Sequence, residues 1–213
     1  MGELAAGIAH EIRNPLTTLK GFIQLLKQEH PSMSHSKLLL EELERIEGIT
    51  NQLLSLAKPQ AIQLMRTDLV MLLQNTIEIL TPQAHLNNVL VKINLGEMDE
   101  SLYILCEANQ LKQAFINLLK NAIESMPNGG LVQLTLNKES NTHVRLTMQD
   151  QGCGIPQELL PRLGEPFYTL KEKGTGLGLM ICYKIIKEHQ GTILLESKVG
   201  EGTKVRIELP LLV

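Results

Sequence analysis

The sequence predicts an all-α helical hairpin, a four-helix bundle when two copies pair, followed by an α/β two-layer sandwich. Two observations predict this fold class. Up to residue 57, apolar residues recur at spacings of three and four, the period of an amphipathic helix. From about residue 66 onward, helical patterns alternate with short runs typical of roughly five or six strands. The change of pattern predicts two domains, residues 1–62 and residues 63–213.

The first domain is predicted to be two helices, over residues 2–29 and residues 34–57. Pro31 separates them, because a proline disfavours the helical conformation of the residue before it. A turn this short makes the two helices antiparallel. Their apolar stripes are too broad for a lone hairpin to bury, so we expect two copies to pair as a homodimer.

His10 is the most informative residue of the first helix. It points directly away from the apolar stripe, and Asn14 lies on the same outward face. This phase argues against a histidine satisfied in the core. It leaves two interpretations, a solvated histidine without a role and a reactive imidazole that other groups must reach. Glu11 beside it supplies a carboxylate that can accept a ring proton.

The boundary between the two domains lies in a predicted linker that runs from Lys58 to residue 66. Asp68 is expected to cap a helix that ends near residue 85, and further helices are predicted over residues 108–126 and 176–189. A turn is expected at Pro127–Gly130 and an irregular Gly-rich stretch over residues 150–175. Strands are predicted at Val89–Leu95, Leu102–Cys106, Val132–Asn137, His143–Gln149, Ile193–Ser197 and Lys204–Leu209.

The composition is that of an ordinary soluble globular protein. A net charge of −3 and 3% aromatic residues, with no Trp, argue against a nucleic-acid partner. Cys106, Cys153 and Cys182 have no metal-binding spacing, and we expect them to be reduced and mostly buried, as in a cytoplasmic domain. Met1 begins inside a helical pattern without a cap, so we expect a fragment whose upstream part is missing.

Four segments of the second domain carry chemistry. Asn117 and Asn121 share one helix face, and amide oxygens of this kind suit Mg²⁺ and phosphate. Asp150 stands at a strand end before Gly152 and Gly154, where it can accept a hydrogen bond from an exocyclic amine such as that of adenine. Each pattern has an ordinary alternative, two surface asparagines and a common strand-to-loop turn.

The other two segments suit phosphate. A glycine-rich run opens a helix, where free backbone N–H groups face an anion, although it matches neither a Walker nor a dinucleotide-binding pattern. The loop before it is polar and cationic, and is either a cover for a triphosphate or a plain surface loop. The residues concerned are Phe167, Lys171 and Lys173 in the loop and Gly174, Thr175, Gly176, Leu177 and Gly178 in the run.

Together and in this order, these motifs resemble the sensor histidine kinase family over nearly the whole chain. The whole sequence most resembles the sporulation kinases of spore-forming bacteria, and among them the B type. The matching segments are the phosphoacceptor motif His10–Leu16, the N box Asn117–Asn121, the G1 box Asp150–Gly154, the F box Pro166–Tyr168, the G2 box Gly174–Leu179 and the closing pair Gly202-Thr203.

The resemblance implies a dimerisation and phosphotransfer domain followed by a Bergerat-type ATP-binding domain that uses ATP and Mg²⁺. It also implies membrane or sensory modules upstream, so that this cytoplasmic part would be attached to a membrane only through missing segments. It implies that His10 accepts the phosphoryl group, with Glu11 as base and Asn14 orienting the transfer, and that an Asp of a response regulator then receives it. The hairpin base near Pro31 is a candidate docking site for a protein inhibitor.

For the nucleotide, the resemblance implies that Asp150 holds the adenine and that Asn121 holds the metal ion. Further nucleotide contacts are expected from Asn117, Lys120, Gly152, Gly154, Phe167, Lys171, Lys173, Gly174, Thr175, Gly176, Leu177, Gly178 and Thr203.

One position departs from the family pattern. Many members carry Lys or Arg three residues after the second asparagine of the N box, where this chain has Glu124. Which cation contacts the phosphates is therefore open, with Lys120 one substitute. A gyrase-like ATPase is a rival, but such enzymes resemble one another in a Glu where this chain has Asn117, so phosphoryl transfer is favoured over hydrolysis. A non-catalytic dimeric scaffold that binds nucleotide is the second rival.

Overall fold

The computed structural model describes residues 16–23, 39–44, 46–48, 50, 63–96, 102–171 and 174–212 of the 213-residue chain. The chain divides into two compact units, Met1–Ala61 and Ile62–Val213. In the first unit every described residue is helical, and all of them lie within the two helices predicted from the sequence. The ammonium of Lys20 lies 3.5 Å from a carboxylate oxygen of Glu44 and 3.4 Å from one of Glu47. The two helices therefore lie side by side, as a hairpin requires.

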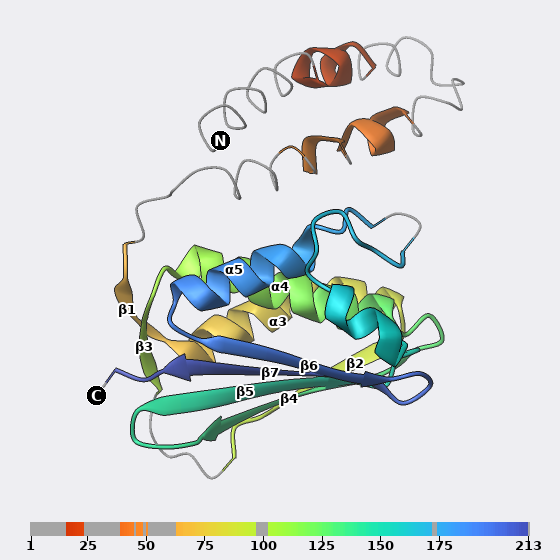
Figure 1. Cartoon of the computed structure of the whole chain (residues 1–213). Coiled ribbons are helices and arrows are strands. Elements are labelled where there is room, and N and C mark those ends of the chain that lie inside the picture. The colour runs from red at the N-terminus through yellow and green to blue at the C-terminus, as the bar shows by residue number, and fades with distance from the viewer. Residues whose placement is uncertain are drawn as a thin grey trace. The chain divides into compact units, whose positions relative to one another are not determined.

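A mixed five-stranded sheet forms one layer of the second unit, in the order β2-β4-β5-β7-β6. Strands β2 and β4 are parallel, and every other neighbouring pair is antiparallel. Helices α3, α4 and α5 all lie on one face of this sheet (Figure 1), so the predicted two-layer sandwich is confirmed. The strands are β2 Val89–Asn94, β4 Gly130–Lys138, β5 His143–Asp150, β6 Thr192–Lys198 and β7 Gly202–Pro210.

The three helices of the second layer are α3 Leu69–Leu86, α4 Ala108–Glu124 and α5 Gly178–Glu188. The predicted cap of α3 is confirmed, because Oδ1 of Asp68 accepts hydrogen bonds from Val70 N at 2.9 Å and Met71 N at 3.2 Å. Helix α4 packs against both α3 and α5. Its buried side chains are Leu111, Ala114, Phe115, Leu118, Leu119, Ala122 and Ile123. The polar residues between them therefore face away from the core.

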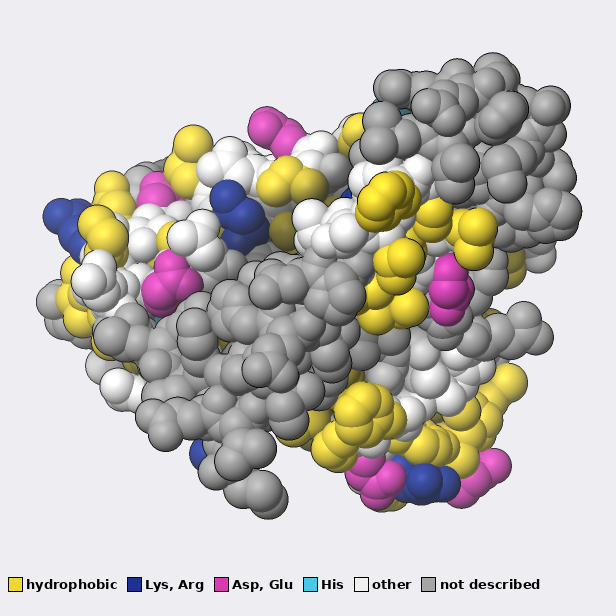
Figure 2. All heavy atoms as spheres, turned by 90° about the horizontal axis from the view of Figure 1, so that it is seen from above, with side chains coloured by type: hydrophobic (Ala, Val, Ile, Leu, Met, Phe, Trp, Pro, Cys, Tyr) yellow, Lys and Arg dark blue, Asp and Glu magenta, His cyan; other side chains and the backbone are white. Residues whose placement is uncertain are grey.

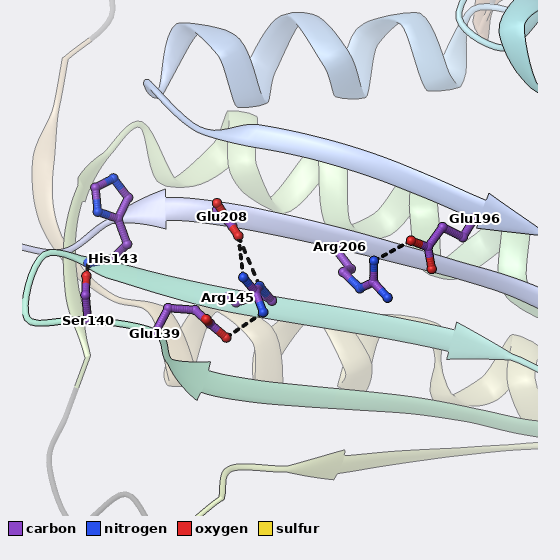
Figure 3. Close-up of polar contacts among 7 residues, drawn as sticks. All are labelled: Glu139, Ser140, His143, Arg145, Glu196, Arg206 and Glu208. Carbon is purple, nitrogen blue, oxygen red and sulfur yellow. Dashed lines mark hydrogen bonds and ion pairs between the residues drawn. The ribbon is translucent and has the colours of Figure 1, made fainter.

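Alternation along β5 decides which side chains reach the helix layer. Val144, Leu146 and Met148 are buried, and Asp150 continues that series at the end of the strand. The opposite face of the sheet carries ion pairs. Figure 3 shows Arg145 bound to Glu139 and Glu208, each at 2.8 Å, and Arg206 bound to Glu196 at 2.5 Å. Half-exposed pairs of this kind contribute little stability, about 1 kcal/mol or less each.

Two elements were missed by the sequence analysis. Strand β1, Met65–Asp68, lies where a linker was predicted, and it pairs antiparallel with β3, Tyr103–Cys106. A 3₁₀ helix, η1, spans Gln157–Arg162 inside the stretch predicted to be irregular. Four residues are too few to show a period, and β1 exists because β3 offers a partner for its backbone. The guanidinium of Arg66 on β1 stacks on the Tyr103 ring of β3, 3.9 Å from the centroid, and stabilises the pairing of the two strands.

The surface of the described residues carries charges of both signs. In the view of Figure 2, Lys and Arg side chains lie interspersed with Asp and Glu side chains, and neither sign gathers into one field. No helix in the described part of the chain combines the length and the apolarity that a membrane crossing needs.

Candidate functional site

The carboxylate of Asp150 is the centre of the site. It is 6% exposed and faces the helix layer from the end of β5. Its Oδ1 accepts three hydrogen bonds, from Gly152 N at 2.8 Å, Thr203 N at 3.1 Å and Ser125 Oγ at 3.2 Å. Among the described residues, no donor reaches Oδ2. One oxygen is thus held by the protein, and the other is available to accept a hydrogen bond from a ligand.

The environment of Asp150 disfavours its charged form. Burial raises the pKa of this carboxyl above its ordinary value, and the three hydrogen bonds oppose that rise without cancelling it. An amine donor on a ligand would compensate a charge that the fold leaves partly unsatisfied.

Close packing at two glycines holds the loop after Asp150 in place. A Cβ at Gly152 would overlap the Ser125 hydroxyl, so only glycine lets this loop lie against the end of α4. Gly154 adopts φ +69° and lies against the backbone of Lys198. The predicted roles of Gly152 and Gly154 in close approach therefore have a structural counterpart within the protein.

Two residues of the site were missed by the sequence analysis. Ser125 is the C-cap of α4, and its carbonyl oxygen also accepts a hydrogen bond from Cys153 N at 3.0 Å. Ser197 is buried on β6, where its hydroxyl accepts a hydrogen bond from Ile155 N at 2.8 Å and lies 2.9 Å from Thr203 Oγ1. A serine at a helix end or within a strand is common, so neither gave a signal in the sequence.

A polar stripe on α4 forms the second part of the site. Asn117, Lys120, Asn121 and Glu124 follow the helical spacing of three and four and lie opposite the buried face. The two asparagines have different partners. Asn117 Nδ2 donates to Gly178 O at 3.4 Å, at the first residue of α5. Asn121 Oδ1 instead accepts a hydrogen bond from the ammonium of Lys171 at 2.9 Å.

Glu124 forms ion pairs with two lysines of this region. Its Oε2 lies 2.5 Å from the ammonium of Lys171, and its Oε1 lies 3.8 Å from that of Lys120. Both lysines proposed from the sequence as phosphate contacts within the described residues are therefore bound to one carboxylate. The structure brings Lys171 to the metal-ligand candidate Asn121, and it leaves Lys120 on the helix surface.

The glycine-rich run leads directly into α5. Thr175 Oγ1 accepts a hydrogen bond from Leu177 N at 3.4 Å, and Gly174 N donates to Lys171 O at 3.1 Å. The N-cap of α5 is Leu177, whose apolar side chain cannot accept hydrogen bonds from the first turn. The start of α5 therefore has no side-chain cap, which leaves its first N–H groups able to bind an anion.

Gly176 closes the base of the loop before α5. It has φ +68°, and a Cβ there would overlap the backbone of Phe167. Phe167 itself has φ +64°, a conformation that costs energy for a residue with a Cβ, and the residue is 61% exposed. Its backbone therefore packs against Gly176.

Four predicted site residues lie outside the described residues: His10, Glu11, Asn14 and Lys173. Of the cysteines, Cys106 and Cys182 are buried as predicted, whereas Cys153 is exposed in the loop after Asp150.

Comparison with known proteins agrees with this geometry. Residues 106–213 match the family described as histidine kinase-, DNA gyrase B- and HSP90-like ATPase, and residues 1–62 match the His Kinase A phospho-acceptor domain. The solved complex of histidine kinase ThkA with response regulator TrrA superposes with a TM-score of 0.71 at 29% identity, covering 99% of this chain and 62% of that chain. The Bergerat-type fold expected from the sequence is thereby confirmed.

The chain is similar to sporulation kinases of Bacillus subtilis (strain 168). Sporulation kinase E is 52% identical over 99% of this chain. Sporulation kinase B is 40% identical over 99% of this chain, so the chain is more similar to the E type than to the B type expected from the sequence. The chain spans 29% of the length of sporulation kinase E and 50% of that of sporulation kinase B. The chain belongs to the family of histidine kinase-, DNA gyrase B- and HSP90-like ATPases, with a phospho-acceptor domain of the histidine kinases in front.

Proposed function

We propose that this chain is a protein histidine kinase that phosphorylates itself on His10 and passes the phosphoryl group to an Asp of a response regulator, as in sporulation signalling. The observation that carries the proposal is the buried carboxylate of Asp150, which has one oxygen bound by the protein and the other without a donor among the described residues. The two family matches and the ThkA complex with a response regulator support it.

The proposed site has one group for the adenine of ATP and another for its phosphates. The exocyclic amine of adenine would donate to Oδ2 of Asp150, and the phosphates would lie at the first turn of α5, against the N–H groups after Gly176. Gly152 and Gly154 shape the adenine end by letting the loop after Asp150 pack against Ser125 and Lys198, and Thr203 N donates to Asp150.

Mg²⁺ fits the donor set on α4. Asn121 Oδ1 is a hard oxygen that already faces a positive charge, that of Lys171. When bound with ATP, the metal ion would neutralise phosphate charge. Among the described residues there is no cluster of three or more His, Cys, Asp or Glu side chains, so the amide oxygen of Asn121 is the proposed protein ligand.

The proposed reaction is an in-line displacement at the γ-phosphorus. One imidazole nitrogen of His10 forms the new P–N bond, the bond from the γ-phosphorus to the β–γ bridging oxygen breaks, and ADP leaves. Glu11 accepts the proton from the other ring nitrogen, and Asn14, one turn away, orients the transfer. The response-regulator Asp then takes the phosphoryl group and restores the histidine.

The domain boundary and the assembly are part of the same proposal. We assign residues 1–62 to dimerisation and phosphotransfer and residues 63–213 to nucleotide binding. Apolar residues left exposed on the hairpin support its pairing with a second copy: Leu19, Phe22, Leu39 and Ile46. A protein inhibitor at the hairpin near Pro31, and attachment to a membrane through upstream segments, complete the proposed context.

Phosphoryl transfer is favoured over hydrolysis by the position of Asn117. A gyrase-like ATPase would need a carboxylate there to activate water, whereas this chain has an amide that binds Gly178 O.

The test is incubation with γ-labelled ATP and Mg²⁺. We expect an acid-labile, base-stable phosphoprotein, and we expect His10→Gln to abolish the label while nucleotide still binds. His85→Gln, an exposed histidine at the end of α3, is the matched control and should keep the label. Label retained by His10→Gln would remove His10 from the reaction.

A further inference from the structure

The cation on Asn121 comes from outside its own helix. Lys171 lies in the loop before α5, yet its ammonium donates to Asn121 Oδ1 at 2.9 Å and lies 2.5 Å from Glu124 Oε2. Asn121 and Glu124 are three residues apart on α4 and both face this ammonium. The Glu124 carboxylate on α4 thus binds a cation that comes from a different segment of the chain.

This arrangement conflicts with a metal ion on the same oxygen. Mg²⁺ binds its oxygen ligands at about 2.0–2.1 Å and requires a lone pair aimed at the metal. An ammonium within hydrogen-bond distance of that oxygen would lie next to the metal ion, where two cations repel strongly. Asn121 can therefore serve either Lys171 or the metal ion at one time.

Lys171 is suited to exchange. Its side chain is 41% exposed and consists of a flexible four-carbon stem with a compact charge, so the ammonium can leave Asn121 without disturbing the core. Glu124 stays beside Asn121 whichever cation is present, since it belongs to the rigid helix α4.

We propose that Lys171 is a tethered cation that occupies the metal-ligand oxygen of Asn121, held by Glu124, and that the metal ion of a bound nucleotide displaces it. When a nucleotide binds without metal, Lys171 takes over the metal ion's role next to the phosphates. The inference rests on the proposed function, because it requires nucleotide at this site.

The test measures how strongly Mg²⁺ and nucleotide favour each other's binding. The dissociation constant of the non-hydrolysable analogue AMPPNP is determined for the whole chain in EDTA and in saturating Mg²⁺. The dissociation constant in EDTA divided by that in Mg²⁺ measures the coupling between metal and nucleotide. We expect Lys171→Met to raise this ratio about three- to tenfold. In EDTA the variant lacks the Lys171 ammonium next to the phosphates, so nucleotide binds more weakly. In Mg²⁺ the metal ion binds Asn121 without having to displace Lys171.

Three variants show whether the effect comes from this exchange. Lys171→Arg keeps the charge and should hold the ratio near that of the unmodified chain. Lys184→Met, which breaks a comparable ion pair with Glu188 on α5, should leave it unchanged. In an Asn121→Ala background, Lys171→Met should change the ratio less than in the unmodified chain, because the competition for the shared oxygen is gone and only the loss of the substitute cation in EDTA remains.

The outcomes separate the inference from the proposed function. Equal weakening in EDTA and in Mg²⁺ would mean that Lys171 contacts phosphate alongside the metal, and this overturns the inference. An unchanged or smaller ratio in a chain that binds AMPPNP also overturns it, and the proposed function survives. Failure of the unmodified chain to bind AMPPNP in either condition would overturn both.

Discussion

The hydroxyl of Ser125 lies 3.2 Å from Oδ1 of Asp150 and joins the end of α4 to the end of β5. The same hydroxyl lies 2.7 Å from Ala122 O, so its single proton is shared between the two acceptors. Helix α4 carries the proposed metal ligand, and β5 carries the proposed adenine ligand. This contact therefore connects the two ends of the nucleotide site.

Removing that contact should weaken nucleotide binding modestly. Ser125→Ala leaves Asp150 with its two backbone donors, and a shared hydrogen bond contributes about 0.5–1 kcal/mol. We expect about a two- to fivefold loss of AMPPNP affinity in a binding titration. Ser140→Ala, in the exposed turn between β4 and β5, is the control and should bind normally. An unchanged affinity in Ser125→Ala would show that the backbone donors alone orient Asp150.

Asp150→Asn should separate binding from stability. The amide keeps an acceptor for the three internal donors, but it places an N–H₂ group where the adenine amine would donate. We expect affinity for adenine nucleotide to fall about 10- to 100-fold, the cost of losing a hydrogen bond to a charged group. Thermal unfolding should show no loss of stability, because a desolvated charge has been removed. A lower melting temperature with normal affinity would contradict the assignment.

The raised pKa of Asp150 predicts a pH dependence with a definite sign. Burial raises the pKa of this carboxyl above its unfolded value, so folding favours the protonated form. Its contribution to the free energy of unfolding is largest below the unfolded pKa and is lost as pH rises through the folded pKa. As pH rises from the unfolded pKa to the folded pKa, the free energy of unfolding of Asp150→Asn should therefore increase relative to that of the unmodified chain, as measured in denaturant titrations. Nucleotide affinity should fall on acidification at a pH above the ordinary range of aspartate. A pH-independent stability difference would contradict the prediction.

Gly152→Ala should damage both the fold and the site. The added methyl would overlap the Ser125 hydroxyl and push the loop from the end of α4. Overpacking of this kind costs about 1–3 kcal/mol, measured as the free energy of unfolding. Gly48→Ala is the matched control, since this helical glycine has no atom within 4 Å of the added methyl and alanine favours a helix. Equal stability of the two variants would show that the loop yields without cost.

The three cysteines should differ sharply in reactivity. Burial raises the pKa of the Cys182 thiol to about 12 and also raises that of Cys106, whereas Cys153 is exposed. Because the thiolate is the reactive form, we expect one fast thiol per folded chain with Ellman's reagent near pH 8. Cys153→Ser should remove this phase, and unfolding in guanidinium should expose the remaining thiols. Two fast thiols in the folded chain would show that the interior opens.

Local sequence patterns carried much of the fold. The cap at Asp68 and the strand alternation that turns Asp150 inward depend on residues within a few positions of one another. The same holds for the polar stripe of α4, whose period of three and four can be read directly. Strand β1 could not be predicted in this way, because its partner β3 lies beyond helix α3.

The sequence by itself determined the two-part architecture, the face of α4 that carries Asn121, and the strand end that carries Asp150. Only the tertiary structure decided what surrounds these groups: Ser125 and the backbone of Thr203 on Asp150, and Lys171 and Glu124 around Asn121. The physical reason is that periodicity states which face a side chain takes, whereas its neighbours come from segments packed against that face. Which lysine contacts the phosphates was therefore open in the sequence, and the structure shows Lys171 beside Asn121, the proposed metal ligand.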